Sequence, residues 1–266
     1  MTSIARCLIG TLLACLTPSA VSAAGPAGAQ ASADGKRLTL GAAYVPPPDA
    51  PDGRIYYEEG FEPDLARLLG ETLGIPVRLV VVLDGAAASE TGSVDGVFVR
   101  LKPDDSRLAS GDAVPLGYRS GLSVAMRSDT TIRRWEDLAG RTVCASEANV
   151  SGQRIARSFG AKVAVVRAPA PALMRVRSGE CDAAIHDRVL LDELFTSRAW
   201  TKFSATLPPV EPTVLAIVPA PTGTGAALRR AASAVSGSGA WRERRVRWAS
   251  TVAFEVYRDQ VAGDCH

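Results

Sequence analysis

The chain has 266 residues, of which 47% are hydrophobic and 22% charged, and its formal net charge at pH 7 is +2. This length supports one large or two medium domains with their own cores, and the near-neutral charge gives no sign of a nucleic-acid-binding surface. Two His and five Cys, without any CxxC or HxxxH spacing, lead us to reject a zinc site, and no other cofactor is indicated.

The N-terminal residues 1–23 have the pattern of an export signal. Arg6 supplies a positive charge, Cys7 to Leu16 form a short apolar run, and Val21-Ser22-Ala23 resemble a cleavage site. The apolar run is too short to span a bilayer. We therefore expect a signal peptide of residues 1–23, removed by cleavage after Ala23.

A lipoprotein signal is a second interpretation of the same segment. The run Leu12-Leu13-Ala14-Cys15 resembles the box that leaves a lipid anchor on Cys15, although Leu13 fits that pattern poorly. Under both interpretations the mature protein is exported. The Ala- and Gly-rich residues 24–37 are expected to be a disordered leader.

Cleavage after Ala23 leaves three cysteines in an oxidising compartment: Cys144, Cys181 and Cys265. The first two lie at apolar strands, so a disulfide between them is one possibility. The sequence leaves this pairing open, because it does not give the distance between their Cα atoms.

The first part of the chain predicts a strand, a helix and two strands, at residues 38–41, 63–73, 77–83 and 94–99. Pro63 suits the first turn of a helix. Leucines then recur at helical spacing, and Gly74 is a typical residue to end the helix. The strands are continuous apolar runs, which is typical of a buried sheet.

The second part predicts a further α/β unit. Strands are expected at residues 121–126, 142–145, 163–166, 183–185 and 212–218, and helices after Gly152 and at residues 172–178, 228–235 and 239–250. The strands at 121–126 and 212–218 stand apart from the β-α repeats. We expect the chain to cross between the two units there.

The stretch from Gly179 to Asp187 is a Gly-bounded turn, a short apolar run and the polar pair His186-Asp187. Ligands of open α/β sheets lie outside the carboxyl ends of the strands. Asp187 is therefore a candidate to face a bound cation such as an ammonium group. The alternative is an Asp that only caps the helix that follows.

A series of motifs runs in order along the chain: GFEPDL at 60–65, VD at 94–95, Arg107, YRSG at 118–121, DLAGRTV at 137–143, SGECDAAIHD at 178–187, and a Gly-to-Trp helix at 239–248. In this order and spacing they resemble the polar amino-acid family of type-2 periplasmic solute-binding proteins, bacterial extracellular solute-binding protein family 3. The resemblance covers roughly residues 38–250 and makes this chain a divergent member.

The resemblance implies an α/β fold with two Rossmann-like lobes joined by two crossover strands, the periplasmic binding protein-like II fold. Lobe 1 would be discontinuous, with residues 38–122 and 213–260, and lobe 2 would comprise residues 123–212. Such lobes close on one small solute by a hinge motion at the crossover strands.

The resemblance also implies roles for particular residues. Arg107 would hold the carboxylate of the ligand through a fork of two hydrogen bonds, and Asp187, with His186 beside it, would hold the α-ammonium group. The loop with Asn149 and Ser151 would also meet the carboxylate, because a helix N-terminus follows it. The alternative, which stays open, is that Asn149 and Ser151 only cap that helix.

Three further residues complete the expected ligand-binding set. Ser120 and Gly121 would line the first-lobe side of the cleft, and Tyr44 is the only obvious stacking ring nearby. No catalytic residue is expected in the set.

The sequence departs from the family at the first-lobe turn, where Arg100, Lys102 and Asp104 replace small ligand-touching residues. Two interpretations of these charges stay open. In the first, Arg100 and Lys102, beside Arg107, select a more anionic solute. In the second, they pair with Asp104 and Asp105 and fill the cleft.

The expected function is capture of a small polar or anionic, amino-acid-like solute for a membrane permease of the ABC type. The first alternative is a periplasmic accessory protein of a quinoprotein alcohol dehydrogenase. Its docking face would be the arginines of the run 242–247, which are otherwise a solvated face: Arg242, Arg244, Arg245 and Arg247. A cyclohexadienyl-dehydratase-like enzyme is the third reading, for which Glu147 and His186 are the only general-acid candidates. We do not expect this protein to be an enzyme.

Overall fold

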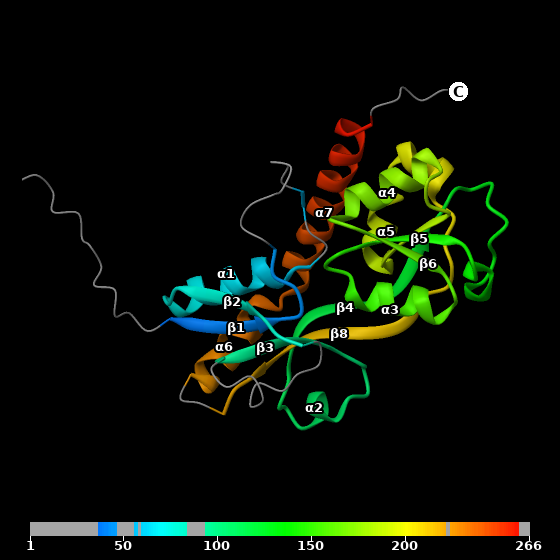
Figure 1. Ribbon diagram of the computed structural model, residues 1–266. Helices are drawn as coiled ribbons and strands as arrows, with labels where there is room; N and C mark the ends of the chain where they lie inside the picture. The colour runs from blue at the N-terminus through cyan, green and yellow to red at the C-terminus, as the bar shows by residue number, and fades with distance from the viewer. Residues whose placement is uncertain (1–36, 47–55, 58–59, 84–93, 222–223, 261–266) are drawn as a thin grey trace, which may run out of the picture. The chain divides into compact units, whose positions relative to one another are not determined.

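The computed structural model describes residues 37–46, 56–57, 60–83, 94–221 and 224–260 (Figure 1). The expected signal peptide, the leader, the lipid anchor at Cys15 and the thiol of Cys265 lie outside these residues. The described part contains one eight-stranded sheet with the strand order β2-β1-β3-β8-β4-β7-β5-β6.

The strands of the sheet are β1 Leu38–Ala42, β2 Val77–Val81, β3 Gly96–Leu101, β4 Val114–Ala125, β5 Thr142–Ser146, β6 Lys162–Val166, β7 Ala183–Asp187 and β8 Val210–Pro219. The helices are α1 Glu62–Leu73, α2 Ser106–Ala109, α3 Val150–Ser158, α4 Pro169–Ser178, α5 Arg188–Leu194, α6 Gly225–Val235 and α7 Ser238–Arg258. Short 3₁₀ helices occur at Trp135–Leu138 and Arg198–Phe203.

Two parallel three-stranded groups form the ends of the sheet. We call β2, β1 and β3 the first half and β7, β5 and β6 the second half. Between them β8 and β4 run antiparallel to each other and to their outer neighbours β3 and β7. The expected α/β class, with two units joined by two crossover strands, is confirmed.

The expected lobe boundaries, 122/123 and 212/213, fall inside β4 and β8. Residues 36–266 form one compact unit, so the boundaries of the lobes stay a prediction.

Local sequence signals set the ends of α1. Pro63 lies in its first turn, and Gly74 ends it in the left-handed conformation, with φ 65°. The N–H of Gly74 donates to the last turn of the helix, which satisfies a carbonyl that the helix leaves free. The strand and helix predicted for residues 38–41 and 63–73 are thus confirmed to within one residue.

Several elements are longer than the sequence predicted, three of which are α4, α7 and β4. Helix α4 begins at Pro169 rather than at residue 172, because proline suits a first turn. Helix α7 continues eight residues beyond the expected end at 250. Strand β4 begins at Val114 rather than 121, because its first residues alternate between buried and exposed instead of forming an apolar run.

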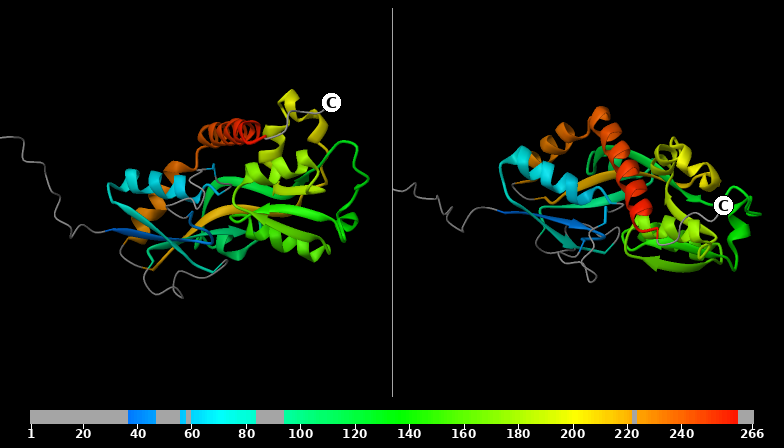
Figure 2. Two further views of the ribbon diagram at one scale, coloured as in Figure 1. Left: turned by 45° about the horizontal axis from the view of Figure 1, so that its top comes forward. Right: turned by 90° about the horizontal axis from the view of Figure 1, so that it is seen from above.

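Helix α7 joins the cores of the two halves. It starts beside α6 and passes to α4 and α5, which it contacts directly (Figure 2). Trp241 and Trp248 are seven residues apart, which places them on one face of the helix, and both are buried. Arg244 is also buried, with its guanidinium 4.7 Å from the centre of the Trp241 ring. The run 242–247 is therefore not a uniformly solvated face.

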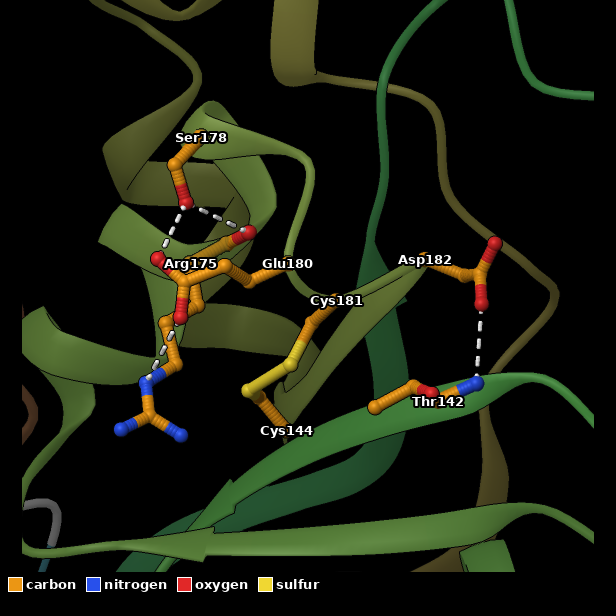
Figure 3. The surroundings of a disulfide bond; sticks show 7 residues. All are labelled: Thr142, Cys144, Arg175, Ser178, Glu180, Cys181 and Asp182. Atoms are coloured by element: carbon orange, nitrogen blue, oxygen red, sulfur yellow. Dashed lines mark hydrogen bonds and ion pairs between the residues drawn. A yellow bond between two sulfur atoms is a disulfide. The ribbon is translucent and has the colours of Figure 1, made fainter.

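A disulfide joins Cys144 on β5 to Cys181 in the turn before β7, with a Cα–Cα distance of 5.9 Å (Figure 3). This resolves the pairing that the sequence left open. Beside it, Asp182 accepts a hydrogen bond of 2.8 Å from the backbone N–H of Thr142. The two links fasten the turn that leads into β7, and with it the position of Asp187, to the neighbouring strand.

Loss of this disulfide is expected to destabilise the protein without changing the fold. Closing a loop of 37 residues stabilises a protein by roughly 3–4 kcal/mol in the chain-entropy description. Urea unfolding with and without reductant measures the difference, and the double variant Cys144→Ala/Cys181→Ala serves as the control that reductant does not affect. Equal unfolding free energies, with mass spectrometry showing that the bond was reduced, would contradict the expectation.

Candidate functional site

A pocket lies between the two halves of the sheet. Its walls are the loop after β1, the start of α1, part of β3, the start of α3, the end of β7 and the beginning of β8. The space between the lining atoms is about 860 Å³, counting the part continuous with solvent. The position agrees with the rule that ligands of α/β sheets lie beyond the carboxyl ends of parallel strands.

An ion pair crosses this pocket. The guanidinium Nη1 of Arg100, on β3 in the first half, donates a hydrogen bond of 2.9 Å to Oδ2 of Asp187 at the end of β7 in the second half. The side chains of Arg100 and Asp187 are 22% and 7% exposed, so water screens the pair weakly. Glu62, at the start of α1, lies 3.9 Å from Nε of Arg100.

The charge of Arg100 is held firmly. Burial alone would lower its pKa, but the nearby carboxylates of Asp187 and Glu62 outweigh this effect and raise the pKa above its ordinary value. The guanidinium therefore stays charged at every pH at which the protein is folded.

Tyr118 gives Asp187 a second partner. Its hydroxyl donates a hydrogen bond of 2.7 Å to the same oxygen, Oδ2. The Tyr118 ring is buried and packs against Phe61 and Trp241, with centroid distances of 5.2 and 4.8 Å. Because these rings fix the hydroxyl, the carboxylate of Asp187 is held in one orientation.

Asp187 is the residue before α5, but its side chain makes no capping hydrogen bond to that helix. The carboxylate lines the pocket instead. Of the two interpretations that the sequence left open, the structure favours the one in which Asp187 faces the pocket.

Arg107 does not lie opposite Asp187, and this corrects the sequence-based expectation. Its Nε and Nη2 each donate a hydrogen bond of 2.9 Å to Asp105, and its side chain is not among those that line the pocket. These bonds, with one from the Arg107 backbone N–H, lower the pKa of Asp105 to about 2. A carboxylate two residues away captures the guanidinium locally, and Arg100 stands opposite Asp187 in its place.

The first turn of α3 forms one wall of the pocket, with Asn149, Val150 and Ser151 among the lining residues. Asn149 caps the helix, because its Oδ1 accepts a hydrogen bond of 2.8 Å from the N–H of Gly152. Its Nδ2 donates to the carbonyl of Ile185 on β7 at 3.0 Å. Asn149 thus both caps α3 and lines the pocket. This wall therefore carries the positive end of the α3 dipole.

The remaining expected residues divide between the pocket and its surroundings. Tyr44 lines the pocket and is half-buried. Ser120 and Gly121 lie on β4 outside the lining, with the Ser120 hydroxyl 3.0 Å from the carbonyl of Gly121. His186 is fully buried, with its ring centre 6.1 Å from that of Trp248.

Neither general-acid candidate of the enzyme interpretation lines the pocket. Glu147 is exposed and His186 is buried among core side chains. The described residues include no group of three or more His, Cys, Asp or Glu placed to hold a metal ion. No helix in the described ranges has the length and apolar character needed to cross a membrane.

Sequence analysis assigned no role to two charged residues of the pocket region. Glu211 lines the pocket and accepts two hydrogen bonds, of 3.0 and 2.7 Å, from Arg154 on α3. Glu62 was noted only as part of a motif. The signal for Arg100 was visible: a charged side chain in the apolar run Val97 to Leu101 needs a partner or an opening.

Comparisons with known proteins agree with this architecture. No protein-family model matches the chain. A probable amino-acid ABC transporter-binding protein of Haemophilus influenzae is 28% identical over 139 residues, which are 51% of this chain and 54% of that protein. The match thus spans about half the length of the relative.

Solved structures with a similar fold cover most of the chain. The GluR0 ligand-binding core in complex with L-glutamate has a TM-score of 0.53 at 16% identity, over 81% of this chain and 99% of that one. Its counterpart from Nostoc punctiforme has a TM-score of 0.52 at 18% identity, over 79% and 98%.

An ancestral amino-acid-binding protein, a precursor of cyclohexadienyl dehydratase, has a TM-score of 0.50 at 21% identity, over 80% of this chain and 95% of that one. The chain therefore has the type-2 periplasmic binding protein fold, and its expected resemblance to the amino-acid-binding proteins of that fold is confirmed.

Proposed function

We propose that this protein is an exported solute-binding protein that captures a small polar or anionic, amino-acid-like solute and delivers it to a membrane transporter. The observation that carries the proposal is the pocket between the halves of the sheet, whose charged side chains come from both. A solute that contacts both walls stabilises the arrangement in which they face each other.

The site residues of this proposal differ from the sequence-based set. Arg100 and the first turn of α3, including Ser151, are the groups that attract a carboxylate, and the ring of Tyr44 packs on the solute. Charge-assisted hydrogen bonds contribute roughly 1.5–3 kcal/mol each. Two or three of them with ring packing reach the roughly 8 kcal/mol of micromolar affinity.

The partner in this proposal is a membrane permease. The Haemophilus influenzae relative is described as a probable ABC transporter-binding protein, which supports a transporter rather than a dehydrogenase as partner. The export signal expected in residues 1–23 supports a periplasmic location. The description of that relative as a binding protein also supports binding rather than catalysis.

Filling the pocket from the first turn of α3 is expected to abolish solute binding. Ser151→Tyr places a ring in the pocket, whereas Ser158→Tyr, on the exposed last turn of the same helix, is the matched control. Calorimetry against a panel of amino and carboxylic acids should show at least one micromolar ligand for the wild type, lost by more than about thirtyfold only in Ser151→Tyr. A panel without any heat of binding, or equal affinities for both variants, would sink the proposal.

Arg107→Gln is expected to leave solute binding within about threefold of the wild type, because its side chain lies outside the pocket. The same change removes hydrogen bonds that favour the charged form of Asp105. The pKa of Asp105, about 2 in the wild type, should therefore rise toward the ordinary value of about 3.9. Titration followed by NMR measures this shift, and an unchanged pKa would show that the pair with Arg107 does not form.

A further inference from the structure

Arg100 is a cation that the chain supplies to its own pocket. We infer that it determines which solutes bind: the Arg100 guanidinium fills the cation position at Asp187, so the solute carries a carboxylate and no ammonium group beside that residue. This inference rests on the proposed function, and it specifies the substrate class as carboxylic acids rather than the corresponding amino acids.

Asp187 would otherwise be the strongest cation-binding group of the pocket. Its side chain is 7% exposed, less than those of Glu62 at 16% and Glu211 at 33%. A buried carboxylate needs a cation or hydrogen-bond donors, because its desolvation is costly. Here Arg100 and Tyr118 both donate to Oδ2. An ammonium group must displace the guanidinium to reach the charge.

The other two carboxylates of the pocket also face guanidinium groups of the chain. Glu211 receives two hydrogen bonds from Arg154. Glu62 lies 3.9 Å from Nε of Arg100. Among the residues that the structure describes, each lining carboxylate thus has a positive partner within the protein, and a solute ammonium group would compete with that partner.

A carboxylate finds a different environment. A guanidinium has five N–H donors, and Arg100 makes one hydrogen bond to the described residues, the one to Asp187. Its side chain lines the pocket together with the first turn of α3. A carboxylate placed between them meets the remaining donors of Arg100 and the positive end of that helix. The negative charge of Glu62 repels a solute carboxylate at this position. Removing that charge therefore tests whether the solute is anionic there.

The experiment compares matched pairs of solutes on the full mature chain. Calorimetry with succinate against aspartate, and with glutarate against glutamate, should show the acid without the ammonium group bound at least about tenfold more tightly by the wild type. This comparison needs no variant. Equal affinities, or tighter binding of the amino acids, would overturn the inference while leaving the proposed function standing, whereas no binding of any solute would remove both.

Variants then locate the preference. Arg100→Met leaves Asp187 without its cation, so binding of the acids should fall by about tenfold or more and binding of the amino acids should appear. Arg107→Met makes the same charge change outside the pocket and should leave the preference unaltered. Glu62→Gln should tighten binding of the acids. A loss of amino-acid binding in this variant would show that Glu62 holds a solute ammonium group, which overturns the inference.

Discussion

The contact between Arg100 and Asp187 is the interaction on which the pocket depends. It joins β3 to β7, strands that lie in different halves of the sheet and are separated by the β8–β4 pair. Removing one member of such a buried pair leaves an uncompensated charge and typically costs about 3–5 kcal/mol. The pair therefore constrains both walls of the pocket, because a displacement of β3 or of β7 would change the distance between the two charges.

The surrounding core keeps this contact in place. Trp241, on α7, packs on the Tyr118 ring whose hydroxyl holds Asp187. The same helix continues onto α4 and α5, and the disulfide of Cys144 fixes the turn into β7. Helix α7 thus stabilises groups in both halves. The orientation of the Asp187 carboxylate consequently depends on contacts from β3, β4, β5 and α7.

The sequence predicted the fold more completely than the site, and the reason is physical. Apolar runs and the Pro63–Gly74 signals depend on local preferences, so the strands and α1 were found. The position of Asp187 followed from the same logic. Its partner did not, because Arg100 lies near the end of β3, Arg107 follows shortly after in α2, and side-chain geometry decides between them. Asp105, two residues before Arg107, binds the Arg107 guanidinium locally, and motif spacing alone does not predict this contact.

A pocket whose buried carboxylate is already paired with a side chain of the protein differs in energetics from one whose carboxylate is paired only by a ligand. When a solute supplies the charge for a buried carboxylate, the empty pocket carries the desolvation cost of that carboxylate, and binding removes it. Here Arg100 removes this cost before any solute arrives. The halves are then held together without ligand, and the arrangement is preorganised. The selectivity that remains comes from the start of α3 and from the donors of Arg100 that no described residue accepts. One guanidinium thus both neutralises Asp187 and selects what enters the pocket.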